Sequence, residues 1–177
     1  MSADSKRSSK VEAVVLQHSD WGEADRLLRI FSREQGKLKI VAKGARRIRS
    51  RKAGHLEPVT RVSLLLARGT GMWIVTQAET INPHLPLRAD LLLTGYACYF
   101  TELIDRFTVE EEQNYALYQL LTRSLERLES PAEPFLVVRY FEIRLLEHLG
   151  YRPELFHCVV CREPIQAQNQ FFSYLQG

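Results

Sequence analysis

KLKIVAKGARRIRSRK, residues 37–52, holds eight of the chain's 24 lysine and arginine residues and no acidic residue. Its first half alternates, with Leu38, Ile40 and Ala42 on one face and Lys37, Lys39 and Val41 on the other. This period of two predicts a half-buried strand whose lysines share one face. Gly44 ends the alternation, and an arginine-rich loop follows it. Such a density of like charge repels itself unless an anion lies across it. The segment is therefore typical of a platform that binds nucleic acid.

A solvated, disordered basic loop is the alternative interpretation, and an anionic membrane surface is a weaker one because no apolar helical face accompanies the charges. On nucleic acid, the lysines would meet phosphates from the strand and the arginines would fold over the backbone, contacts that carry affinity without reading sequence. Trp21 and Trp73 could stack on bases or serve packing, and Trp73 is preferred because it lies on a predicted strand. The predicted nucleic-acid contacts are Lys37, Lys39, Lys43, Arg46, Arg47, Arg49, Arg51, Lys52 and Trp73.

The first half of the chain has the pattern of a small barrel. Short β-rich runs separated by turn residues predict strands over residues 11–18, 27–32, 37–43, 59–67 and 72–79. Five short strands in about 70 residues, with a long central loop, are typical of the OB-fold. We expect residues 1–10 to be a disordered lead-in and residues 11–82 to form this domain.

The second half is predicted to be helical, which makes the fold class α+β. Prolines at 83 and 86 interrupt the chain, and we place the domain boundary there. Apolar residues at helical spacing predict helices over residues 87–107, 111–128 and 133–149. Cys98 lies in an aromatic stripe and is expected in the core. The helical domain is expected to cover residues 86–157, with a partial zinc-knuckle segment over residues 158–177.

Charge divides the chain in the same way. Residues 1–85 carry 16 basic and 8 acidic side chains, a net +8, whereas residues 86–177 carry 8 and 13, a net −5. The basic half is expected to meet nucleic acid and the acidic half a protein partner. No run of 18 apolar residues, no secretory signal and no disulfide framework is present in the sequence, so we expect a cytoplasmic protein. Catalytic signatures are missing, so we do not expect an enzyme.

Cys158 and Cys161 form the one metal-binding motif. Two thiolates at this spacing can bind one zinc ion, but a closed site needs two further ligands. Of the possible ligands, only His148 and His157 lie nearby in sequence. Half of a zinc site, a redox pair and a chance spacing all remain open. The redox pair is disfavoured because no helix visibly begins at Cys158 to lower the pKa of its thiol.

Several segments resemble the RecO family of bacterial recombination mediators. The N-terminal stretches are GEADRL at 22–27, IFSREQGKL at 30–38 and VAKGARR at 41–47. The similarity continues through LEP at 56–58, GYRP at 150–153 and the cysteine pair, and so covers about residues 10–175. The resemblance implies an N-terminal OB-fold followed by a helical domain.

The resemblance also implies a function. RecO proteins bind single- and double-stranded DNA, anneal complementary strands and help to load RecA onto strands coated by single-stranded DNA-binding protein. RecR and the acidic tail of single-stranded DNA-binding protein are the implied partners. That tail docks on the helical domain in the family, where Arg139 and Arg144 are candidate contacts.

One departure from the family concerns zinc. Zinc-containing members carry a second cysteine pair about 15–20 residues after the first, and they continue for some tens of residues, whereas this sequence reaches Gly177 before such a pair. We therefore expect a shortened chain with an incomplete zinc site. The sequence thus predicts a non-enzymatic DNA-binding mediator. An RNA-binding OB-fold module, a protein-interaction scaffold and, more remotely, a zinc-dependent hydrolase are the alternatives.

Overall fold

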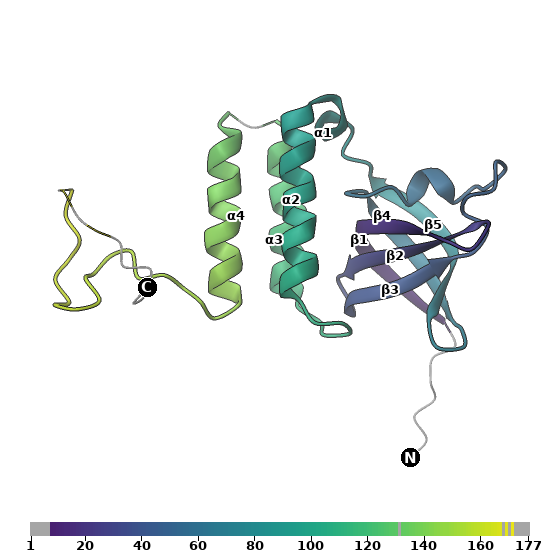
Figure 1. The fold of residues 1–177 in the computed structure, drawn as a ribbon, viewed down its shortest axis with the longest axis horizontal. Coiled ribbons are helices and arrows are strands. Elements are labelled where there is room, and N and C mark those ends of the chain that lie inside the picture. The colour runs from purple at the N-terminus through teal and green to yellow at the C-terminus, as the bar shows by residue number, and fades with distance from the viewer. Residues whose placement is uncertain (1–7, 131, 168, 170, 172–177) are drawn as a thin grey trace, which may run out of the picture.

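The computed structural model describes residues 8–130, 132–167, 169 and 171, and it places a β-barrel beside a group of helices (Figure 1). A short 3-10 helix, Ala53–His55, lies in the long loop between the third and fourth strands. The strands are β1 Ser8–Trp21, β2 Asp25–Ser32, β3 Gly36–Ala42, β4 Arg61–Arg68 and β5 Trp73–Asn82. Residues 8–10, expected in a disordered lead-in, belong to β1 and pair with β4, while residues 1–7 of that lead-in lie outside the described residues.

The barrel closes in the strand order β1-β2-β3-β5-β4. Neighbouring strands are antiparallel except for β3 and β5, which run parallel where Ile40 pairs with Trp73 and Val41 with Ile74. A five-stranded barrel with this Greek-key order is the OB-fold. The predicted fold class is confirmed.

The alternation that opens the basic segment sets the two faces of β3. Leu38 and Ile40 are buried in the barrel core, whereas Lys39 is exposed on the outer face. Ala45 and Leu56 join the same core from the two ends of the long loop after β3. Because apolar side chains hold both of its ends, the basic loop leaves the barrel from fixed positions.

The helices are α1 Leu85–Ala89, α2 Leu91–Phe107, α3 Tyr115–Leu128 and α4 Pro134–His148. The helix predicted over residues 87–107 is divided at Asp90, whose backbone is extended and whose carboxylate accepts hydrogen bonds from the N–H groups of Leu92 and Leu93 at 2.8 and 3.0 Å. This is an N-cap, which starts a new helix. The helix predicted from residue 111 begins at Tyr115, after the cap residue Asn114.

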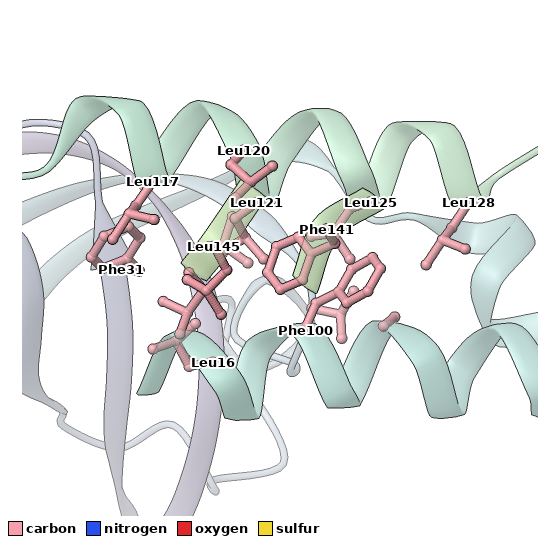
Figure 2. Packing of buried hydrophobic residues seen from close by; sticks show 14 of the residues in the cluster. Leu16, Phe31, Phe100, Leu117, Leu120, Leu121, Leu125, Leu128, Phe141 and Leu145 are labelled. Atoms are coloured by element: carbon pink, nitrogen blue, oxygen red, sulfur yellow. The ribbon is translucent and has the colours of Figure 1, made fainter. Parts of the chain in front are cut away.

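A second apolar core, distinct from the one inside the barrel, lies between the barrel and the helices (Figure 2). Leu16 and Phe31 enter it from β1 and β2, and Phe31 lies beside Leu117 of α3 whereas Leu16 lies beside Leu145 of α4. Phe100 of α2 and Phe141 of α4 stack deeper in the bundle with ring centroids 4.1 Å apart. Full burial of one such side chain contributes roughly 1.5–3 kcal/mol, so this core fixes the helices against the barrel.

A polar network closes one edge of the same junction. Arg61 of β4 donates to Glu12 of β1 at 2.7 Å and to Glu126 of α3 at 3.0 Å, and the Tyr118 hydroxyl donates to Glu12 at 2.9 Å. Burial alone would raise the pKa of Glu12, but the hydrogen bonds from Arg61 and Tyr118 outweigh burial and hold that pKa below its usual range. Glu12 therefore stays charged and links the barrel to α3.

Cys98, which we expected in the core, is exposed on α2. The apolar stripe of that helix passes through Ala97, Phe100 and Ile104 instead. No helix in the described part of the chain is both long and apolar enough to cross a membrane.

Candidate nucleic-acid interface

The basic loop begins with a turn that is fastened to the β1–β2 hairpin. Gly44 adopts a φ of +66° and donates its N–H to the Asp25 carboxylate at 2.7 Å. The Arg46 N–H donates to the carbonyl of Ala24 at 2.9 Å. The loop then continues on the side of the barrel farther from the helices (Figure 1). Its first residues are therefore positioned by the barrel, even though the side chains of Lys43 and Arg46 reach solvent.

Five of the predicted contacts form a set of exposed cations: Lys39, Lys43, Arg47, Arg49 and Arg51. Within the described ranges, the side chains of these five residues make no hydrogen bond or ion pair with the protein. Lys39 extends from β3 and the other four from the loop. We call this set the free cations. Since nothing in the described protein neutralises them, they can bind an anion without first breaking an internal contact.

Lys37 is not one of them, because its ammonium group is held by α2 and faces away from solvent. Its ammonium group donates to the backbone carbonyl of Asp105 on α2 at 2.6 Å and lies 3.8 Å from the Asp105 carboxylate. Only 12% of the Lys37 side chain is exposed. Lys37 shares the outer face of β3 with Lys39, but its end of the strand is covered by the helices.

Lys37 and Lys39 therefore allow a matched test. Replacing Lys37 with Met should lower the free energy of unfolding by about 1–3 kcal/mol, since a charged hydrogen bond is lost, and should change DNA affinity less than about threefold. Replacing Lys39 with Met should leave stability within about 0.5 kcal/mol and reduce the salt slope of DNA binding by about 0.7. Urea unfolding and fluorescence anisotropy would measure both. A Lys37 variant of normal stability that binds DNA as weakly as the Lys39 variant would refute this assignment.

Arg46 and Lys52 are partly engaged by the barrel. Arg46 pairs with Asp20 at 3.1 Å and donates to the carbonyls of Gly22 and Glu23. Lys52 donates to the carbonyl of Val75 at 3.1 Å. Both predicted contacts are thus drawn toward the protein, and they hold the loop against the barrel rather than extending freely from it.

The structure reverses the preference between the two tryptophans that the sequence offered for base stacking. Trp73 is partly buried against the barrel core, and the Arg68 guanidinium lies 5.0 Å from its ring centroid. Trp21 is 48% exposed at the end of β1, next to Gly22, whose carbonyl accepts from Arg46. Trp21 is therefore the better-placed stacking residue.

Sequence reasoning overlooked Ile48, which is fully exposed between two free cations. The sequence feature that could have indicated it is a single apolar side chain within a run of arginines. Such a residue can insert between bases.

The two cysteines lie in a tight turn between residues 157 and 164. The Cys158 N–H donates to the carbonyl of Glu163, and the Arg162 N–H donates to the carbonyl of Cys158, both at 2.9 Å. Hydrogen bonds from the backbone N–H groups of Cys161 and Val160 lower the pKa of the Cys158 thiol, which favours a ligating thiolate. However, the residues that the structure describes contain no cluster of three or more metal-binding side chains. The pair fits half of a tetrahedral zinc site, and the described residues do not complete it.

The two candidate partner contacts lie on α4. Arg139 pairs with Glu142 at 2.9 Å and covers the Phe135 ring, whereas Arg144 pairs with Glu147. Arg144 also borders a cavity between α3 and α4.

The fold and the free cations together define a class: an OB-fold protein with a cationic loop and a helical domain packed on its barrel. Two family models match the chain in that order, "Recombination protein O N terminal" over residues 6–84 and "Recombination protein O C terminal" over residues 88–177. The chain therefore belongs to the RecO family, as the sequence predicted.

Its relatives include proteins named "DNA repair protein RecO". The protein from Roseiflexus sp. (strain RS-1) is 39% identical over 171 residues, which cover 97% of this chain and 60% of that protein. That from Dehalococcoides mccartyi (strain CBDB1) is 37% identical over 168 residues, 95% of this chain and 66% of the relative. The protein from Bacillus subtilis (strain 168) is 34% identical over 154 residues, which cover 87% of this chain and 60% of that protein. The chain thus spans less than two thirds of the length of each of these relatives.

Proposed function

We propose that this chain is a non-enzymatic, cytoplasmic DNA-binding component of DNA repair. The observation that supports it most is the set of free cations, one on β3 of the OB-fold barrel and four on the loop that follows it, together with the exposed Trp21 at the end of β1. Cations of this kind contact the sugar–phosphate backbone, whether in a single or a double strand. The names of the relatives support the repair context.

We further propose that the chain anneals complementary strands and assists loading of RecA onto coated single strands. Backbone binding suits annealing, because it neutralises phosphates without covering a particular sequence. The acidic tail of single-stranded DNA-binding protein would approach the helical domain near Arg139 and Arg144, and RecR would be a second partner. Zinc, if bound, would take Cys158 and Cys161 as two of its four ligands and would order the turn around them.

Salt dependence tests the proposed backbone contacts. If the five free cations each meet one phosphate of a single strand, the logarithm of the association constant should fall with the logarithm of salt concentration at a slope of about −3.5. The affinity should then drop about a hundredfold between 50 and 200 mM salt. Anisotropy titrations with a labelled oligonucleotide measure the slope, and a value near zero would exclude this mode of binding.

Backbone contacts alone do not separate DNA from RNA, so an RNA-binding role is the second candidate. Titrations with DNA and RNA of equal sequence distinguish the two: a preference for RNA would require contacts to the 2′-hydroxyl groups. If the chain instead bound only an acidic peptide and no DNA at low salt, a protein-interaction scaffold would replace both.

A further inference from the structure

A basic cavity of about 170 Å³ lies between α3 and α4, outside the region of the basic loop. Arg123 and Arg127 line it from α3, and Arg144 and His148 line it from α4. None of the other lining residues is acidic, although Glu147 lies beside the cavity in an ion pair with Arg144. A space of this size holds a few water molecules, or one small tetrahedral anion with water around it.

Ser124 gives this cavity a second feature that points to a ligand. The residue lines the cavity and is completely buried, yet its hydroxyl has no hydrogen-bond partner among the described residues. A buried hydroxyl without a partner destabilises the folded chain, because its hydrogen bonds to water are lost and not replaced. If the side chain turned toward the cavity, an oxyanion there would accept the hydroxyl proton and remove that destabilisation.

The charges of the lining residues indicate which anion fits. Arg144 is neutralised by its ion pair with Glu147. Arg127 lies over the Tyr140 ring at 4.8 Å, a contact that fixes its guanidinium without neutralising it. Arg123 has no ion pair or hydrogen bond in the described structure. Two uncompensated positive charges match a phosphomonoester, which carries about −1.5 to −2 at pH 7, better than a single carboxylate.

We propose that the cavity between α3 and α4 is a binding site for a phosphomonoester dianion, either inorganic phosphate or the terminal phosphate of a nucleic acid strand. Arg123 and Arg127 supply planar donor groups suited to phosphate oxygens, and the buried Ser124 hydroxyl donates to the same anion once its side chain turns toward the cavity. The site is independent of the free cations, so it stands or falls separately from the proposed DNA binding by the basic loop.

Calorimetric titration of the intact chain with inorganic phosphate at pH 7.5, at constant ionic strength with chloride, is the primary test. The double variant Arg123→Ala/Arg127→Ala should weaken phosphate binding at least tenfold, and Ser124→Ala should weaken it about threefold to tenfold. A control variant, Arg106→Ala/Arg162→Ala, removes two exposed arginines elsewhere and should bind within twofold of the unmodified chain. Equal phosphate binding by the unmodified chain and both cavity variants would overturn the proposal.

Oligonucleotides with and without a 5′-phosphate identify the source of the phosphate. Tighter binding of the phosphorylated strand, lost in the double variant, would assign the cavity to strand ends. Equal binding of the two strands, with arginine-dependent binding of inorganic phosphate, would assign it to free phosphate. A peptide with a free C-terminal carboxylate that binds through Arg123 and Arg127 more tightly than phosphate would replace the proposal with a peptide site.

Discussion

Reversing three of the free cations, with Lys43→Glu, Arg47→Glu and Arg49→Glu in one chain, is expected to weaken binding to single-stranded DNA about a thousandfold in 50 mM salt. Each phosphate contact on a single strand contributes about 0.7 to the salt slope, which corresponds to about eightfold in affinity at that salt concentration. Loss of three contacts therefore accounts for about 500-fold, and repulsion between the new carboxylates and the phosphates adds the rest. Anisotropy titrations at several salt concentrations would measure both the loss and a slope reduced by about 2.

A control with the same change in net charge separates local contacts from general repulsion. Arg106→Glu, Arg152→Glu and Arg162→Glu introduce the same six units of negative charge on the helical side of the chain, where all three side chains are exposed. This variant should lose less than tenfold in affinity, and the loop variant should lose affinity for every DNA sequence alike. Equal losses in the two variants, or a loss confined to certain sequences, would contradict backbone binding by the loop.

The sequence predicted the barrel well because strand faces are set locally. The alternation around Leu38 and Ile40 requires one face inside and one outside, whatever the rest of the chain does. The helix over residues 87–107 was predicted less well, because Asp90 sits within an otherwise helical apolar pattern. Asp90 divides the helix because its side chain caps the start of α2, and the spacing of apolar residues does not reveal such a cap.

The free cations could not be separated from the engaged ones by sequence. Lys37 and Lys39 have the same surroundings in the chain, but the partner of Lys37 is Asp105, 68 residues away. Arg46 and Arg47 are adjacent, and only Arg46 meets Asp20. Which cations remain free therefore depends on how the helices and the β1–β2 hairpin pack around the basic segment, and this is a tertiary property.

Gly36 is the residue at which a small substitution should most disturb the junction of barrel and helices. It has a φ of +67°, and a Cβ atom there would lie 1.8 Å from the carbonyl oxygen of Glu112, in the segment between α2 and α3. The neighbouring Glu111 N–H donates to the Lys37 carbonyl at 2.8 Å and holds that segment against β3. Gly36→Ala would have to push this backbone away. We expect a loss of about 2–5 kcal/mol in the free energy of unfolding, the sum of about 1–2 for the left-handed backbone and about 1–3 for overpacking.

Gly22 provides the matched control, because it occupies the β1–β2 turn with a φ of +58° and a Cβ atom there would have no neighbour within 4 Å. Gly22→Ala should therefore cost only the backbone contribution, about 1–2 kcal/mol. Urea unfolding of both variants isolates the close approach as the difference between them, and hydrogen exchange at the Glu111 amide should accelerate only in the Gly36 variant. If the two substitutions cost the same and the Glu111 amide stays protected in both, the segment after α2 contributes little to holding the helices on the barrel. If Gly36→Ala lowers the free energy of unfolding more than Gly22→Ala does, the extra loss comes from the close approach of Glu112. Glycine at position 36 would then be required by a contact with a distant part of the chain as well as by its own backbone conformation.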